Sequence, residues 1–131
     1  MMKIRKILSV MLVMIMLISS FPLEGRMAEE VIQSGKCGDN VTYKLFSDGT
    51  LVISGTGKMR PNNISTENPW RNVLDFIKKV VIEDGVETIG SNSFSGFKNM
   101  ESVEIPDSIT AIPYAAFSGC TSLKAIDIHD G

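Results

Sequence analysis

Histidine is almost absent from this sequence, since the single copy, His129, lies two residues from the end. It has no second ligand at metal-binding spacing, and no Ser or Cys lies at a nucleophile turn where it could act with a histidine. The sequence therefore argues against catalysis by a histidine-dependent triad. We assign no catalytic residue, no metal ligand and no cofactor, and we expect a protein that is not an enzyme.

A long hydrophobic run is also lacking. The longest, Ile7–Ile18, is interrupted only by Ser9 and follows a basic start, which is typical of a signal peptide and too short for a comfortable membrane span. We predict an exported protein with a signal peptide at residues 1–28 and a tether at residues 29–36. The cleavage site is left open, and a leader retained as an anchor is the alternative. No Cys follows the run, so a lipoprotein anchor is not supported.

A basic excess is missing once the leader is set aside. Four of the 13 Lys and Arg residues, but only one of the 15 Asp and Glu residues, precede Glu29, which leaves nine basic residues against 14 acidic ones and a net charge of −5. Nucleic acids and anionic membrane surfaces need basic patches. We therefore expect no nucleic-acid partner and no membrane contact beyond the signal peptide.

Cysteine is scarce, with only Cys37 and Cys120 in the chain. A disulfide between them is allowed in an exported protein. Cys120, however, lies 23 residues after Phe97, at the same position of the repeat described next. We therefore interpret Cys120 as a small buried hydrophobic residue.

One 23-residue pattern is present twice and begins a third time. When Val80–Ser102 is placed over Val103–Ala125, seven of the 23 positions are identical, and most of the remaining agreement is apolar residue for apolar residue. A fixed period between about 20 and 50 residues is typical of a solenoid, in which each unit buries its apolar face against the next. We predict repeats over residues 79–131, with the third copy incomplete.

Each copy begins with a short alternating run, Val80–Ile82 and Val103–Ile105, which predicts a strand with one inward face. Turn residues follow, and the remaining apolar residues are spaced too irregularly for one long helix. We predict a short extended piece and then a helical turn. Phe94 and Phe117 are expected to stack as the central ladder of the core.

The second copy contains a characteristic set of residues, Val103–Pro106, Ile109, Ile112, Ala116, Phe117, Cys120 and Leu123. In order and spacing these residues resemble the BspA-like leucine-rich repeats, and the similarity extends from about Cys37 to the end of the chain. The first copy departs from the pattern with Glu83 in place of Pro, Ser93 in place of Ala and Phe97 in place of Cys. The resemblance implies a mainly β leucine-rich-repeat solenoid with short helical turns.

Residues 37–78 are predicted to form an N-terminal cap for this solenoid. Alternation on both sides of the Ser47–Gly49 turn predicts a β-hairpin, and an exposed irregular loop is expected at Gly55–Glu67. Asn68 can act as the N-cap of a short amphipathic helix that runs to Ile77. Trp70, on the apolar side of that helix, is expected to seal the first layer of the core.

Asp84, Asp107 and Asp130 recur at the repeat period, so stacking would bring them about 5 Å apart. Such a column could bind calcium, but the Gly and Asp ligands that accompany it in calcium-binding repeats are missing. An Asp at each bend more often caps a turn. We adopt the turn interpretation.

The outward positions of the predicted strands form the candidate binding surface, because a stacked parallel ladder offers an extended face. The resemblance implies an exported bacterial surface protein that acts in adhesion and protein binding, with a protein ligand such as a host or extracellular-matrix protein. The alternative is the non-catalytic N-terminal part of a larger secreted enzyme or cell-wall protein truncated at residue 131. The surface residues are Lys79, Val81, Ser102, Glu104, Ala125 and Asp127.

The third copy stops soon after Ile126–Ile128, which predicts a strand with an unpaired edge. Phe117, Ile112 and Leu123 would then have their outer sides open to water. We expect either a truncated piece of a longer repeat protein or self-association through Ile126–Ile128.

Overall fold

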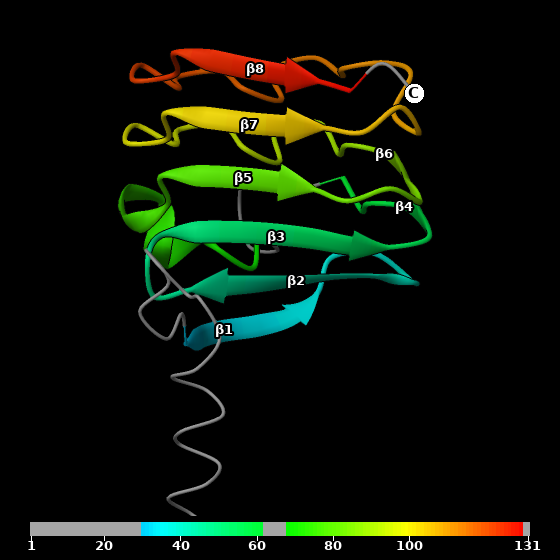
Figure 1. The fold of residues 1–131 in the computed structure, drawn as a ribbon, viewed down its shortest axis with the longest axis horizontal. Helices are drawn as coiled ribbons and strands as arrows, with labels where there is room; N and C mark the ends of the chain where they lie inside the picture. The colour runs from blue at the N-terminus through cyan, green and yellow to red at the C-terminus, as the bar shows by residue number, and fades with distance from the viewer. Residues whose placement is uncertain (1–29, 62–67, 130–131) are drawn as a thin grey trace, which may run out of the picture.

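Most of the described chain is strand and turn, with little helix. The computed structural model describes residues 30–61 and 68–129, so the predicted signal peptide, part of the predicted loop at Gly55–Glu67 and Asp130 lie outside it. Six strands form one sheet in the order β1-β2-β3-β5-β7-β8, and the short strands β4 and β6 pair apart from it (Figure 1). The strands are β1 Val31–Lys36, β2 Val41–Phe46, β3 Thr50–Gly55, β4 Gly57–Lys58, β5 Lys79–Ile82, β6 Val86–Thr88, β7 Ser102–Ile105 and β8 Ala125–Ile128.

The sheet changes from antiparallel to parallel at β3. Strands β1, β2 and β3 run antiparallel, and β3, β5, β7 and β8 all run parallel. The predicted hairpin is confirmed as β2 and β3, with Tyr43 opposite Ile53 and Leu45 opposite Leu51. All four of these side chains are buried, because alternate residues of each strand point to the same face.

The parallel strands are aligned at an interval of 23 residues. Val80 pairs with Val103, and Val103 pairs with Ile126. The same interval joins the segments outside the strands, where the Gly96 amide donates to the Ser118 carbonyl, 2.7 Å away. The offset read from the sequence is therefore the pairing register of β5, β7 and β8.

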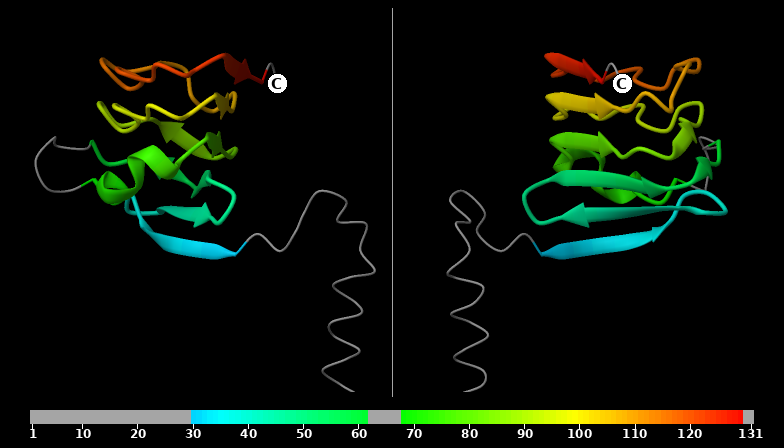
Figure 2. Two further views of the ribbon diagram at one scale, coloured as in Figure 1. Left: turned by 90° about the vertical axis from the view of Figure 1, so that its left-hand side faces the viewer. Right: turned by 45° about the vertical axis from the view of Figure 1, so that its right-hand side comes forward.

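The sheet and the turns occupy opposite sides of the molecule (Figure 2). Buried side chains from both sides meet in one core between them. Trp70, Phe94 and Phe117 form a ladder of near-parallel rings, with centroids 5.8 Å and then 5.5 Å apart. The predicted stacking of Phe94 on Phe117 is confirmed. Trp70 is fully buried at the start of the ladder, as expected, and its indole Nε1 donates to the Ser93 carbonyl at 2.8 Å.

The prediction of a tether at residues 29–36 is wrong for Val31–Lys36, which forms β1 and pairs with β2. The sequence of β1, VIQSGK, has no alternation of apolar and polar residues that would indicate a strand, and most of its side chains are exposed. Its pairing is supported by a distant contact, since the Gln33 Nε2 donates to the Tyr43 hydroxyl at 3.0 Å and to the Pro69 carbonyl at 2.6 Å.

The predicted amphipathic helix from Asn68 to Ile77 is shorter and tighter than expected. The structure has a 3₁₀ helix, η1, at Arg71–Phe76, and the Asn68 side chain accepts from the Trp70 amide at 3.1 Å without capping a helix. Val73 has φ of −127° and Ile77 is extended, because the chain must turn into β5 two residues later. Short helices are marginal, so this tertiary demand decides the geometry.

The predicted helical turn within each repeat is a series of tight turns. Asn92 and Ala115, which occupy the same position in the two copies, have φ of 59° and 55°. A left-handed residue interrupts right-handed helix, so no helical segment forms at this point of either copy.

Candidate binding face

The six residues of the predicted binding surface lie together on the side of β5, β7 and β8 that faces away from the core. We call this surface the outward face. Lys79, Ser102 and Ala125 pair in one row across the three strands. A second row contains Val81, Glu104 and Asp127.

Exposure along the outward face rises toward β8. The four positions on β5 and β7 are half-buried, whereas Ala125 and Asp127 are exposed. The residues between them, such as Val80 and Val103, are fully buried. The alternation of a β-strand therefore turns one face toward the core and the other toward the solvent.

One ion pair lies on the outward face of the described strands. Lys79 Nζ is 2.5 Å from Glu104 Oε1, so the pair joins the two rows diagonally between β5 and β7. Because both side chains are partly exposed, water screens the pair and its contribution to stability is small. The pair neutralises the charge of Lys79. Asp127, which lies next to Glu104 in the second row, has no ion pair on the described part of this face.

A third row follows the strand ends and was missed by the sequence reasoning. Glu83, Pro106 and His129 come directly after β5, β7 and β8, again at intervals of 23 residues. His129 was considered only as a catalytic or metal-binding residue. The repeat offset itself was the signal that could have placed it beside Pro106.

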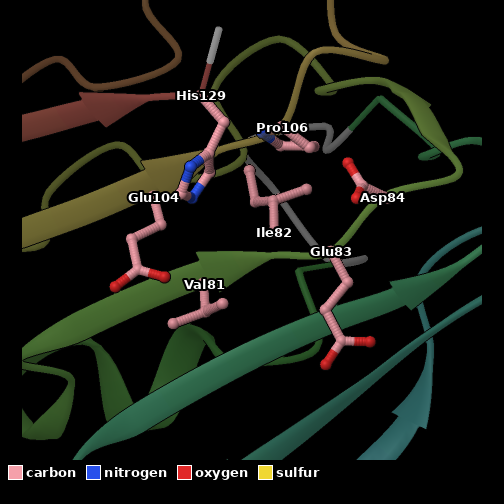
Figure 3. Close-up of a pocket in the computed structure, with 7 residues that line it drawn as sticks. All are labelled: Val81, Ile82, Glu83, Asp84, Glu104, Pro106 and His129. Atoms are coloured by element: carbon pink, nitrogen blue, oxygen red, sulfur yellow. The ribbon is translucent and has the colours of Figure 1, made fainter. Parts of the chain in front are cut away.

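This third row borders a hollow of about 410 Å³ on the outward face, at the carboxyl ends of the strands (Figure 3). In Figure 3, His129 extends from the end of β8, and Glu83 and Asp84 project from the chain leaving β5. The residues that line the hollow are Val81, Ile82, Glu83, Asp84, Glu104, Pro106 and His129.

The bend beside the hollow depends on Gly85 and on a contact between repeats. Gly85 has φ of 103°, and a Cβ at this position would lie 2.5 Å from the Gly55 carbonyl oxygen. The Ser108 hydroxyl accepts from the Gly85 amide at 3.3 Å and donates to the Val86 carbonyl at 2.7 Å. One repeat thus holds the turn of the preceding repeat in place.

Neither cysteine forms a disulfide, and both are free thiols. Cys37 belongs to the buried core, and burial raises its pKa to about 11. Cys120 is half-buried and not fully buried as predicted; this burial raises its pKa, and its thiol donates to the Phe94 carbonyl oxygen at 3.1 Å. Thiols in such surroundings stay protonated at neutral pH and pack as small apolar groups.

Asp130, the last member of the acidic column, lies outside the described residues, and within residues 30–61 and 68–129 no group of three or more His, Cys, Asp or Glu side chains is placed to hold an ion. Asp84 and Asp107 are both exposed. The same residues contain no helix with the length and apolar character needed to cross a membrane.

Comparison with known proteins finds a similarity to leucine-rich repeats in the C-terminal half of the chain. A family model described as BspA type leucine rich repeat region, with six copies, matches residues 71–131. A leucine-rich repeat protein from Eubacterium ventriosum has a similar structure, with 29% identity and a TM-score of 0.69. The match covers 73% of this chain but only 26% of that protein, so the chain spans about a quarter of its length.

A second solved structure, a leucine rich cell surface protein from Faecalibacterium prausnitzii, is 15% identical with a TM-score of 0.33. That match covers 73% of this chain and 40% of the other. No curated protein matches the chain.

Proposed function

Because residues 71–131 match a family model of BspA-type leucine-rich repeats, we propose that this chain belongs to an exported bacterial surface protein that binds other proteins through the outward face. Proteins with such repeats are typically found at the cell surface, and the repeats are in general non-catalytic modules. In this proposal the parallel strands are part of a solenoid of 23-residue units, and the β2–β3 hairpin caps its first layer.

The observation that carries the proposal is the separation of the two faces of β5, β7 and β8. The inward positions repeat the same apolar chemistry, with Val80, Val103 and Ile126 in one row. The outward positions change from Lys79 to Ser102 and from Val81 to Glu104 at the same register. A rigid ladder that varies only its outer side chains suits the recognition of an extended protein surface.

The adhesion role can be tested by attachment of beads coated with the full chain to surfaces coated with individual extracellular-matrix proteins. Val81→Arg with Ala125→Arg should abolish attachment, because both changes place a long cation on the outward face. Ala111→Arg with Thr121→Arg adds the same charge at exposed positions outside the strands and should leave attachment intact. Equal attachment by both double variants would refute binding through this face.

Export is proposed from the leader sequence and is tested separately. Fractionation of cells that express the full chain should find it outside the cytoplasm. A purely cytosolic product would contradict the surface role.

A second candidate function is that of a non-catalytic part of a larger secreted enzyme or cell-wall protein. It is favoured by one observation, since the match covers only 26% of the Eubacterium ventriosum protein. Sequencing the gene beyond the codon for Gly131 separates the two candidates, because a hydrolase domain there would support this one.

A further inference from the structure

The hollow on the outward face combines an apolar floor with an acidic rim. Val81, Ile82 and Pro106 supply the apolar part of the lining. Glu83, Asp84 and Glu104 supply three carboxylates, with no Lys or Arg among the lining residues. A guest in this hollow would therefore meet hydrocarbon below and negative charge at the rim.

The carboxylates differ in their partners. Glu104 is paired with Lys79, whereas Glu83 and Asp84 are exposed and form no ion pair within the described residues. Glu83 stands where the repeat pattern has Pro, and Pro106 holds that position in the next copy. The first copy therefore places a carboxylate at the rim where the second copy has a proline.

We propose that the hollow binds a Lys or Arg side chain of the protein partner. The alkyl stem of such a side chain can lie along Val81 and Pro106 while its charged head reaches Glu83 and Asp84. An acidic side chain would be repelled, and a neutral one would displace water from the carboxylates without compensation. The inference rests on the proposed function and specifies the chemistry of its partner.

The inference can be tested with a short peptide of alternating arginine and threonine, added to the ¹⁵N-labelled full chain at low salt. The amide signals of Glu83, Asp84, Glu104 and His129 should shift on titration. Matched peptides with glutamine or glutamate in place of arginine should leave these signals unchanged. Binding should weaken as salt is raised, because exposed charges are screened.

A pair of double variants separates a specific contact from general attraction. Glu83→Gln with Asp84→Asn should weaken binding of the arginine peptide about tenfold, as expected for two partly exposed charge contacts. Glu87→Gln with Asp107→Asn removes the same charge at exposed positions that do not line the hollow, and should change the affinity little. Equal weakening by both double variants, or binding of the glutamine peptide, would overturn the inference.

The bead assay distinguishes failure of this inference from failure of the proposed function. If Glu83→Gln with Asp84→Asn retains full attachment while Val81→Arg with Ala125→Arg abolishes it, the outward face binds a partner but the hollow takes no cation. If Val81→Arg with Ala125→Arg attaches normally, the proposed function itself fails.

Discussion

Trp70 joins the hairpin to the repeats through contacts on three sides. Its ring meets Tyr43 edge to face at a centroid distance of 5.3 Å and stacks on Phe94 at 5.8 Å. Its Nε1 donates to the Ser93 carbonyl. Aromatic pairs and a satisfied indole N–H together make a buried Trp costly to remove.

We predict that Trp70→Ala lowers the free energy of unfolding by about 3–5 kcal/mol, because it leaves a large cavity between the hairpin and the first repeat. Urea unfolding followed by circular dichroism would measure the loss. Trp70→Phe is the control, since it keeps an aromatic ring in the ladder and should lose less stability, although it removes the hydrogen bond and part of the ring volume. Trp70 is the only Trp, so its emission should be blue-shifted in the folded protein, and a solvent-like emission would contradict the buried position.

Ser93 offers the opposite case, a buried group that reduces stability. Its Oγ is buried and has no hydrogen-bond partner among the described residues, whereas the corresponding residue of the next copy is Ala116. We predict that Ser93→Ala raises the free energy of unfolding by about 1 kcal/mol, because a hydroxyl without a partner is removed. The matched reverse change, Ala116→Ser, should destabilise. Destabilisation by Ser93→Ala would mean that the hydroxyl is satisfied.

The buried thiol of Cys37 predicts a pH dependence at the alkaline end. Burial raises its pKa from 9.0 to about 11, so the folded state keeps the proton that the unfolded state has already lost. The stability from this group is therefore complete below pH 9 and declines as the pH rises toward 11. Unfolding measured across this range should show a smaller decline for Cys37→Ala than for the wild type. An equal decline in the free energy of unfolding for Cys37→Ala and the wild type between pH 9 and 11 would exclude a contribution from this thiol.

At the scale of elements, the turns decide how one repeat follows another. Gly85→Ala should lower the free energy of unfolding by about 1–3 kcal/mol, because Ala would be strained in the left-handed backbone conformation of Gly85. The loss should be larger still, because the new Cβ would also clash with the Gly55 carbonyl oxygen. Gly57→Ala is a matched control, since Gly57 has φ of 95° but open space around its Cβ. Urea unfolding of both variants should therefore show the larger loss for Gly85→Ala. An equal loss of stability in both variants would show that the contact between the new Cβ and the Gly55 carbonyl contributes nothing to the effect.

The elements that could be predicted from the sequence are those whose own residues carry the signal. The alternation of Val80 and Ile82, repeated at Val103 and Ile105, identified the strands and their register. β1 was missed because it is held by pairing and by Gln33, not by burial of its own side chains. Helix η1 was mistaken for a longer helix because the turn into β5 overrides its apolar spacing.

The candidate site was predictable to the same extent. The six outward residues follow from the strand period and the repeat offset, so the sequence placed them in the right rows. The repeat offset could have placed His129 beside Pro106, but the hollow itself could not be predicted, because it depends on how the chain leaves β5. Such contacts arise between segments that no local pattern connects.

At the scale of the whole molecule, the apolar rows continue to the last strand described and end there without cover. Val103 and Ile105 on β7 are 0% and 2% exposed, whereas Ile126 and Ile128, their neighbours on β8, are 48% and 57% exposed. Ile112 is also 48% exposed. Within the described residues β8 pairs on one side only, so its other backbone edge is open to a further strand.

We therefore propose that the chain self-associates through β8 when no further repeat covers it. Sedimentation of the full chain across a concentration series should show a monomer that converts to a larger species as concentration rises. Ile126→Lys with Ile128→Lys should keep it monomeric, because charged side chains on an edge strand oppose pairing. Val31→Lys with Ile32→Lys makes the same change on exposed residues of β1, the opposite edge of the sheet, and should leave association unchanged. A monomer at every concentration would contradict the proposal, because it would show that the exposed apolar side chains of β8 are tolerated in water. Loss of association in the β1 variant would show that the chains meet through β1 and not through β8.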